Sequence, residues 1–90
     1  MKPSHYYEWG GRLTPRQRKV LQIMAADPDG DDGELVYEQG ECWLGLERVA
    51  SRTLFALLRA CAISQDGEGL SGDGKLERYR INETGRRLIA

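Results

Sequence analysis

The chain lacks any apolar run of the ~20 residues that a bilayer span needs, and its N-terminus lacks the apolar core of a signal peptide. We therefore expect a soluble protein that stays in the cytoplasm, away from membranes. Cysteine is also scarce: Cys42 and Cys61 form no C-x-x-C pair and no cluster with metal-ligand spacing. Because both lie among apolar residues, we expect two buried free thiols and no disulfide.

Residues typical of catalysis are few as well. The single histidine is His5, and the glycine-rich segment 65–75 lacks the G-x-x-x-x-G-K-[ST] order of a phosphate-binding loop. The segment 27–34 has the acid density of a calcium loop, but position six of that loop would be Asp32 instead of glycine. The sequence therefore predicts a binding protein that is not an enzyme and that uses neither a cofactor nor a metal ion.

What the sequence does have is 90 residues, enough for one domain, with 40% hydrophobic and 30% charged residues. The formal net charge of −1 hides three blocks of charge. Residues 1–26 carry five bases and one acid, residues 27–47 eight acids and no base, and residues 48–90 eight bases and five acids. A near-neutral chain is a poor non-specific nucleic-acid binder, so its bases would have to gather on one face.

The first helix is indicated by its N-terminal residues. Thr14 is a favourable N-cap, and Gln17 completes a capping box with it. Apolar residues then recur at helical spacing until a proline ends the pattern, which predicts a helix over about 15–26. Residues 1–12 precede it as an aromatic-rich arm with no helical or strand period.

The second helix, over 51–61, has the clearest pattern in the chain. Ser51 is a suitable N-cap, and apolar residues at i, i+3, i+4 and i+7 form a stripe expected to face the core. The stripe consists of Leu54, Leu57, Leu58 and Cys61, with Phe55 beside it, while Arg52, Thr53, Ala56, Arg59 and Ala60 are expected to face outward.

The remaining elements are short. The turn signal Gln39-Gly40 joins two β-prone runs into a hairpin, and Asn82 is a suitable cap for a last helix. Segment 65–75 contains four glycines and no period, so we expect a mobile loop. The predicted order is helix 15–26, strands 35–38 and 42–44, helix 51–61, strand 62–64, loop 65–75, strand 76–81 and helix 83–90.

Two stretches carry a resemblance to a known superfamily. The segment from Val49 to Ile63, VASRTLFALLRACAI, is similar to the recognition-helix segment of small bacterial and phage winged-helix regulators. The segment from Tyr79 to Arg86, YRINETGR, resembles the second wing strand and following helix of the MarR and PadR groups, where a Y-x-L-T-x-x-G-R pattern recurs. The resemblance covers residues 13–90 and implies an α+β winged-helix domain.

One departure from that pattern concerns helix 2. An ordinary helix-turn-helix has a full helix just before the turn, whereas residues 46–50 leave room for barely one helical turn. Two possibilities stay open: helix 2 is present in rudimentary form, or the hairpin replaces it.

The resemblance implies a DNA-binding transcriptional regulator of a bacterium, phage or mobile element, with double-stranded DNA as its partner. Arginine bonds guanine edges or phosphates, and small residues let a helix approach a groove closely. Arginines on the outer face of the last strand would grip phosphates beside the helix. The implied DNA-binding residues are Arg52, Thr53, Ala56 and Arg59 on the helix and Lys75, Arg78 and Arg80 on the wing.

The alternative is a protein-binding winged helix, such as a phage or mobile-element product that inhibits a host protein complex. Its contact would be formed by the aromatic arm and the acidic segment 27–47, through Tyr6, Tyr7, Trp9, Asp31, Asp32 and Glu34. A contiguous positive face uniting Arg16, Arg52, Arg59 and Arg80 would favour DNA, whereas a mixed surface would favour a protein partner. Whether the protein acts as a monomer or a homodimer stays open.

Overall fold

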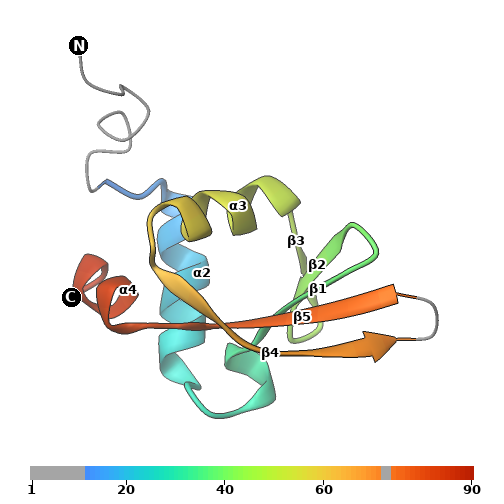
Figure 1. Cartoon of the computed structure of the whole chain (residues 1–90). Coiled ribbons are helices and arrows are strands. Elements are labelled where there is room, and N and C mark those ends of the chain that lie inside the picture. Colours follow the sequence, from blue (N-terminus) through green and yellow to red (C-terminus); the bar gives the residue numbers. More distant parts are fainter. Residues whose placement is uncertain (1–11, 72–73) are drawn as a thin grey trace.

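The described part of the chain forms three α-helices and a five-stranded antiparallel sheet (Figure 1). The structure, a computed structural model, describes residues 12–71 and 74–90, and only the backbone at 67–71 and 74–75. The expected α+β class is confirmed. The elements are α2 (Pro15–Ala26), the 3-10 helix η1 (Asp31–Gly33), β1 (Leu35–Glu38), β2 (Glu41–Leu44), β3 (Glu47–Val49), α3 (Ser51–Arg59), β4 (Ile63–Ser71), β5 (Gly74–Ile81) and α4 (Glu83–Leu88). The strand order is β3-β2-β1-β5-β4.

Helix α2 begins as its sequence predicts. The hydroxyl of Thr14 accepts a hydrogen bond from the backbone N–H of Gln17 at 3.1 Å, and the Gln17 side-chain oxygen accepts one from the Thr14 N–H at 3.1 Å. The capping box is therefore confirmed. Val20, Leu21 and Met24, on one face of α2, are buried in the core.

The first hairpin also forms where predicted. Gln39 and Gly40 both have positive φ, at 53° and 82°, which suits the two-residue turns whose twist matches that of the flanking strands. A second turn at Gly45 and Leu46 then leads into β3, Glu47–Val49, which pairs with β2. The segment where a helix 2 would lie is thus a strand. Of the two possibilities left open by the sequence, a rudimentary helix 2 is excluded, and strands take its place.

Helix α3 is shorter than predicted and is capped differently. Ala50 is its N-cap, and the Ser51 hydroxyl donates a hydrogen bond to the Gly40 carbonyl oxygen at 3.2 Å instead of capping the helix. At the other end, Cys61 has a φ of 59° and follows the C-cap. The N–H groups of Cys61 and Ala62 return to the carbonyls of Leu58 and Leu57, a Schellman motif that turns Cys61 away from the helix. Cys61 is exposed, so its predicted burial is wrong.

The buried face of α3 is rotated relative to the prediction. Leu54 and Leu57 are fully buried as expected, but Thr53 and Ala60, predicted to face outward, are only 6% and 9% exposed. Phe55, predicted beside the core stripe, is 45% exposed. The helix contacts α2, β2 and β4 at once, and these neighbours cover the small side chains flanking the leucines.

The glycine-rich segment forms strands. Segment 65–75 was expected as a mobile loop, but its described residues, 65–71 and 74–75, belong to a long hairpin. In it β4 pairs with β5 from Ile63 to Ser71, with a bulge between Gln65 and Gly67. This hairpin extends beyond the rest of the fold in Figure 1. Gly67, Gly69 and Gly74 lie in the described strands, and glycine has no side chain to contribute to an apolar alternation, so the sequence pattern did not predict these strands.

The last helix explains why Asn82 and Gly85 occur in the segment from Tyr79 to Arg86. The Asn82 side-chain oxygen accepts a hydrogen bond from the Gly85 N–H at 2.9 Å, which confirms the predicted cap. Gly85 is buried, and a Cβ there would overlap the Ala62 carbonyl oxygen. The position therefore requires glycine. Helix α4 ends at Leu88, two residues before the predicted end.

The core lies between the helices and one face of the sheet. Alternate strand residues face the helices, which gives the burial pattern of a sheet that is covered on one side. The buried strand residues are Leu35, Cys42, Leu44, Val49, Ile63, Tyr79 and Ile81.

Candidate functional site

The outward face of α3 carries a short row of side chains at i, i+3, i+4 and i+7, which places them on one side of the helix. Arg52, Phe55 and Arg59 are exposed, and Ala56 between them is half-buried. We call these four residues the α3 stripe. In Figure 1, α3 runs along the upper side of the fold, and no other labelled helix or strand lies above it.

The two arginines of the α3 stripe are unpaired. Within residues 12–71 and 74–90, neither Arg52 nor Arg59 makes an ion pair or a side-chain hydrogen bond. A guanidinium in this state offers five donors in a planar fork, which matches phosphate oxygens and the acceptor edge of guanine. Both predicted residues are therefore placed where a partner can reach them.

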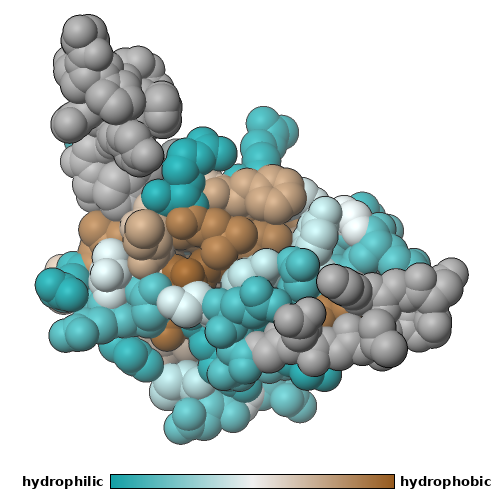
Figure 2. All heavy atoms as spheres, viewed as in Figure 1, coloured by the Kyte–Doolittle hydropathy of each residue, from teal (hydrophilic) through white to brown (hydrophobic). Residues whose placement is uncertain are grey.

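Phe55 occupies the centre of the α3 stripe. Its ring packs edge-on against Tyr37 of β1, with centroids 5.9 Å apart and planes at 63°, and 45% of the residue is exposed. Figure 2 shows apolar atoms gathered around α3 on the face in view. Sequence reasoning assigned Phe55 to the margin of the core and missed its exposure. Its spacing of three from Arg52 and four from Arg59 was the available signal.

Thr53 does not belong to this surface. It is 6% exposed and lies on the buried side of α3, so the prediction that Thr53 faces outward is wrong. Ala56 remains on the α3 stripe, where its small side chain lets another molecule approach the helix backbone closely.

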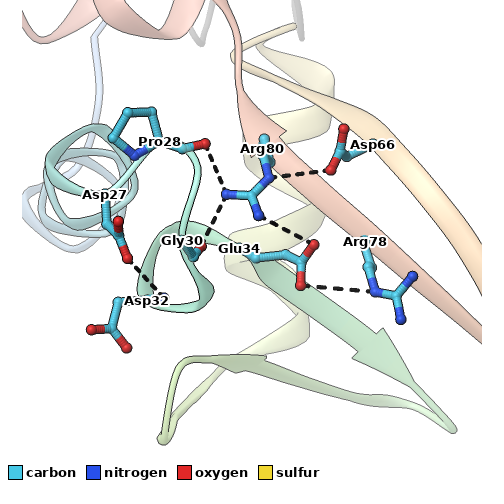
Figure 3. A network of polar contacts seen from close by, with 8 residues as sticks. All are labelled: Asp27, Pro28, Gly30, Asp32, Glu34, Asp66, Arg78 and Arg80. Carbon is cyan, nitrogen blue, oxygen red and sulfur yellow. Dashed lines mark hydrogen bonds and ion pairs between the residues drawn. The ribbon is translucent and has the colours of Figure 1, made fainter.

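Arg80 is held inside the fold. Figure 3 shows its guanidinium among the backbone of the turn before η1 and two carboxylates. It donates hydrogen bonds to the carbonyl oxygens of Pro28 at 2.8 Å and Gly30 at 3.0 Å, and it pairs with Glu34 at 3.5 Å and Asp66 at 3.2 Å. Only 21% of the side chain is exposed, so the prediction that Arg80 turns outward is wrong.

Arg78, the next predicted basic residue of β5, adds little to a positive surface. Arg78 pairs with Glu34 at 3.8 Å, and 42% of its side chain is exposed (Figure 3). Lys75 was predicted in a loop but lies in β5, and its side chain is outside what the structure describes. Carboxylates thus neutralise both described arginines of this strand.

The acidic segment forms a second feature. The Asp27 carboxylate accepts a hydrogen bond from the Asp32 N–H at 3.1 Å, which tightens the turn. A hollow of about 440 Å³ is lined by residues of this acidic segment and of the turn at Gly45 and Leu46. Leu46 is fully exposed. The predicted partner-contact residues Asp31, Asp32 and Glu34 all line this hollow, whereas Tyr6, Tyr7 and Trp9 lie outside the described residues. The other lining residues are Val36, Gly45 and Leu46.

Folding separates the charges by structural element. The three helices contain seven bases and one acid, Glu83, whereas residues 27–34 contain five acids and no base. The proposed face uniting Arg16, Arg52, Arg59 and Arg80 does not form, because Arg80 is bound to the acidic turn. The helical bases are Arg16, Arg18, Lys19, Arg52, Arg59, Arg86 and Arg87.

The groups with shifted pKa values lie in the core. Burial raises the pKa of the Cys42 thiol to about 11. Burial, followed by its hydrogen bond to Glu77, raises the pKa of the Tyr79 hydroxyl to about 12. Both groups stay protonated at neutral pH and act as packing residues.

The described residues show no cluster of three or more side chains suited to a metal ion. Over the same residues, none of the helices has the length and apolar character needed to cross a membrane. Comparison of the chain with protein-family models, with curated proteins and with solved structures gave no match.

Proposed function

We propose that this chain is a winged-helix protein that binds double-stranded DNA through α3 and regulates transcription in a bacterium, phage or mobile element. The order of elements supports the proposal: an opening helix, three strands, a helix with one exposed face and a long hairpin. The first strand, β1, pairs with the last, β5. Strands β2 and β3 stand where an ordinary helix-turn-helix has its second helix.

The observation that carries the proposal is the α3 stripe. Two arginines without an ion-pair or hydrogen-bond partner among the described residues lie two helical turns apart, about 10 Å along the axis. A small residue between them lets the helix approach a groove closely. Arg52, in the first turn, suits base contact, and Arg59 suits a phosphate.

The hairpin β4–β5 contributes less to DNA affinity than the sequence implied. Arg78 and Arg80 would have to leave Glu34 and Asp66 before either could neutralise a phosphate. The phosphate contacts therefore come from the helices, which carry the surplus of bases. The salt dependence of DNA binding should therefore reflect the number of helical bases that contact phosphates.

The test is a selection from random duplexes at moderate salt, followed by titration of variants on the enriched sequence. Arg52→Ala should lower affinity by roughly 5- to 150-fold and relax specificity at one base pair, since a bidentate contact is worth about 1–3 kcal/mol. Arg59→Ala should weaken binding to all sequences alike. Arg48→Ala is the matched control, because Arg48 is exposed on β3 and paired with Glu41 at 3.5 Å.

No enrichment by the wild-type protein would refute the proposal. A palindromic operator would indicate that a homodimer binds, and a single site would indicate a monomer.

A second candidate function is binding to a host protein through the acidic hollow. Two observations favour it. The face uniting Arg16, Arg52, Arg59 and Arg80 does not form, since Arg80 is bound to the acidic turn and Arg16 pairs with Glu47 at 3.9 Å. Apolar surface is also exposed: Leu46 fully and Trp43 to 38%. Asp31 and Asp32, exposed and without salt bridges in the described structure, would complement a basic partner. A host protein whose capture is abolished by Leu46→Asp and preserved by Arg52→Ala would support this function, and equal capture by both variants would exclude it.

A further inference from the structure

We propose that Phe55 reads the 5-methyl group of thymine in the major groove, an inference that rests on the DNA-binding function proposed above. Phe55 lies one helical turn from Arg52 and one from Arg59, on the same side of α3. Whatever surface the two arginines reach, the phenyl ring faces it.

The ring is placed for contact and is not needed in the core. Phe55 is 45% exposed, whereas its neighbour Leu54 and the core residue Leu57 are fully buried. The edge-on contact with Tyr37 covers one side of the ring and limits the directions in which it can turn. A fixed apolar group at the middle of a helix face loses little side-chain entropy on binding.

The chemistry of the groove decides what the ring contacts. The major-groove edge of a base pair offers hydrogen-bond donors and acceptors and one apolar group, the thymine methyl. Phe55 has no polar atom and would leave donors or acceptors of other pairs without partners. Neighbouring Ala56 is too short to compete for the same position. A thymine between the base bonded by Arg52 and the phosphate bonded by Arg59 is therefore favoured.

The experiment uses the full chain and the duplex obtained by selection. Each thymine is replaced in turn by deoxyuridine, which removes the methyl group and keeps every donor and acceptor. At one position the wild-type protein should bind the deoxyuridine duplex about fourfold more weakly, since burying one methyl-sized group is worth about 0.8 kcal/mol. Phe55→Ala should bind the thymine duplex more weakly and bind both duplexes alike.

Two further variants keep the result interpretable. Leu46→Ala removes a fully exposed apolar side chain outside the α3 stripe and should keep the wild-type difference between the two duplexes. Phe55→Gln removes the apolar ring and leaves a longer side chain than alanine, and it replaces Phe55→Ala if that variant has a lowered melting temperature.

The outcomes separate the two proposals. No selected sequence at all refutes DNA binding itself. A selected sequence with no thymine-methyl dependence in the wild type, or with dependence that survives in Phe55→Ala or Phe55→Gln, overturns the role of Phe55 and leaves DNA binding by Arg52 and Arg59 standing. Loss of affinity for a protein partner in the Phe55 variants, without any effect on DNA, also overturns it.

Discussion

At the scale of single residues, two leucines with opposite environments test the core. Leu57 is fully buried among α2, α3 and the sheet, and Leu46 is fully exposed. We predict that Leu57→Ala lowers the free energy of unfolding by about 2–5 kcal/mol, because a cavity remains after the side chain is removed. Leu46→Ala should change it by less than about 0.5 kcal/mol. Urea unfolding of both variants is the measurement, and equal midpoints would remove Leu57 from the core.

The two cysteines differ in the same way. Both are unpaired, but Cys61 is exposed and Cys42 is buried, and burial raises the pKa of the Cys42 thiol to about 11. Only a thiolate reacts readily with a disulfide reagent. At pH 8 one thiol should react quickly in the folded protein, and the second only after denaturation. Cys61→Ser should abolish the fast phase, and a fast phase that persists in this variant would contradict the burial of Cys42.

At the scale of elements, Arg80 joins the β4–β5 hairpin to the acidic turn. Its guanidinium satisfies two backbone carbonyl oxygens and pairs with Glu34 and Asp66, and 21% of the side chain is exposed. We predict that Arg80→Ala lowers the free energy of unfolding by about 1–3 kcal/mol, because these partners lose a charged donor. Arg80→Lys should restore only part of this, since an ammonium lacks the planar fork.

The matched control for this substitution is the exposed pair on β3. Arg48 pairs with Glu41 at 3.5 Å, and 63% of its side chain is exposed, so Arg48→Ala should cost less than about 0.5 kcal/mol. Similar losses for both arginines would mean that the contacts of Arg80 do not stabilise the hairpin.

At the scale of the whole molecule, charge is separated although the net charge is only −1. The helices hold seven bases and one acid, and the turn 27–34 holds five acids. For the DNA binding proposed above, we predict that the logarithm of the association constant falls linearly with the logarithm of salt concentration. The double variant Arg52→Ala, Arg59→Ala should flatten this slope by roughly one, because Arg59 no longer neutralises a phosphate and Arg52 contacts a base. An unchanged slope in the double variant would show that other bases make the phosphate contacts.

Local interactions made several features predictable from the sequence alone. The capping box of Thr14 and Gln17, the turn at Gln39 and Gly40 and the cap at Asn82 each depend on residues no more than four positions apart. The α+β class and the position of α3 follow from such local patterns together with apolar periodicity. The shared outward face of Arg52 and Arg59 was predicted in this way, because a helix fixes which side chains share a face.

The tertiary structure decided what the remaining side chains do, since their partners are distant along the chain. Arg80 bonds a carbonyl 52 residues away, and that contact turns a predicted DNA-binding residue into an internal one. Thr53 became buried because α2 and the sheet close over that side of α3, and the same packing left Phe55 exposed. Helical spacing defines a face, but only the neighbouring elements determine which face meets solvent.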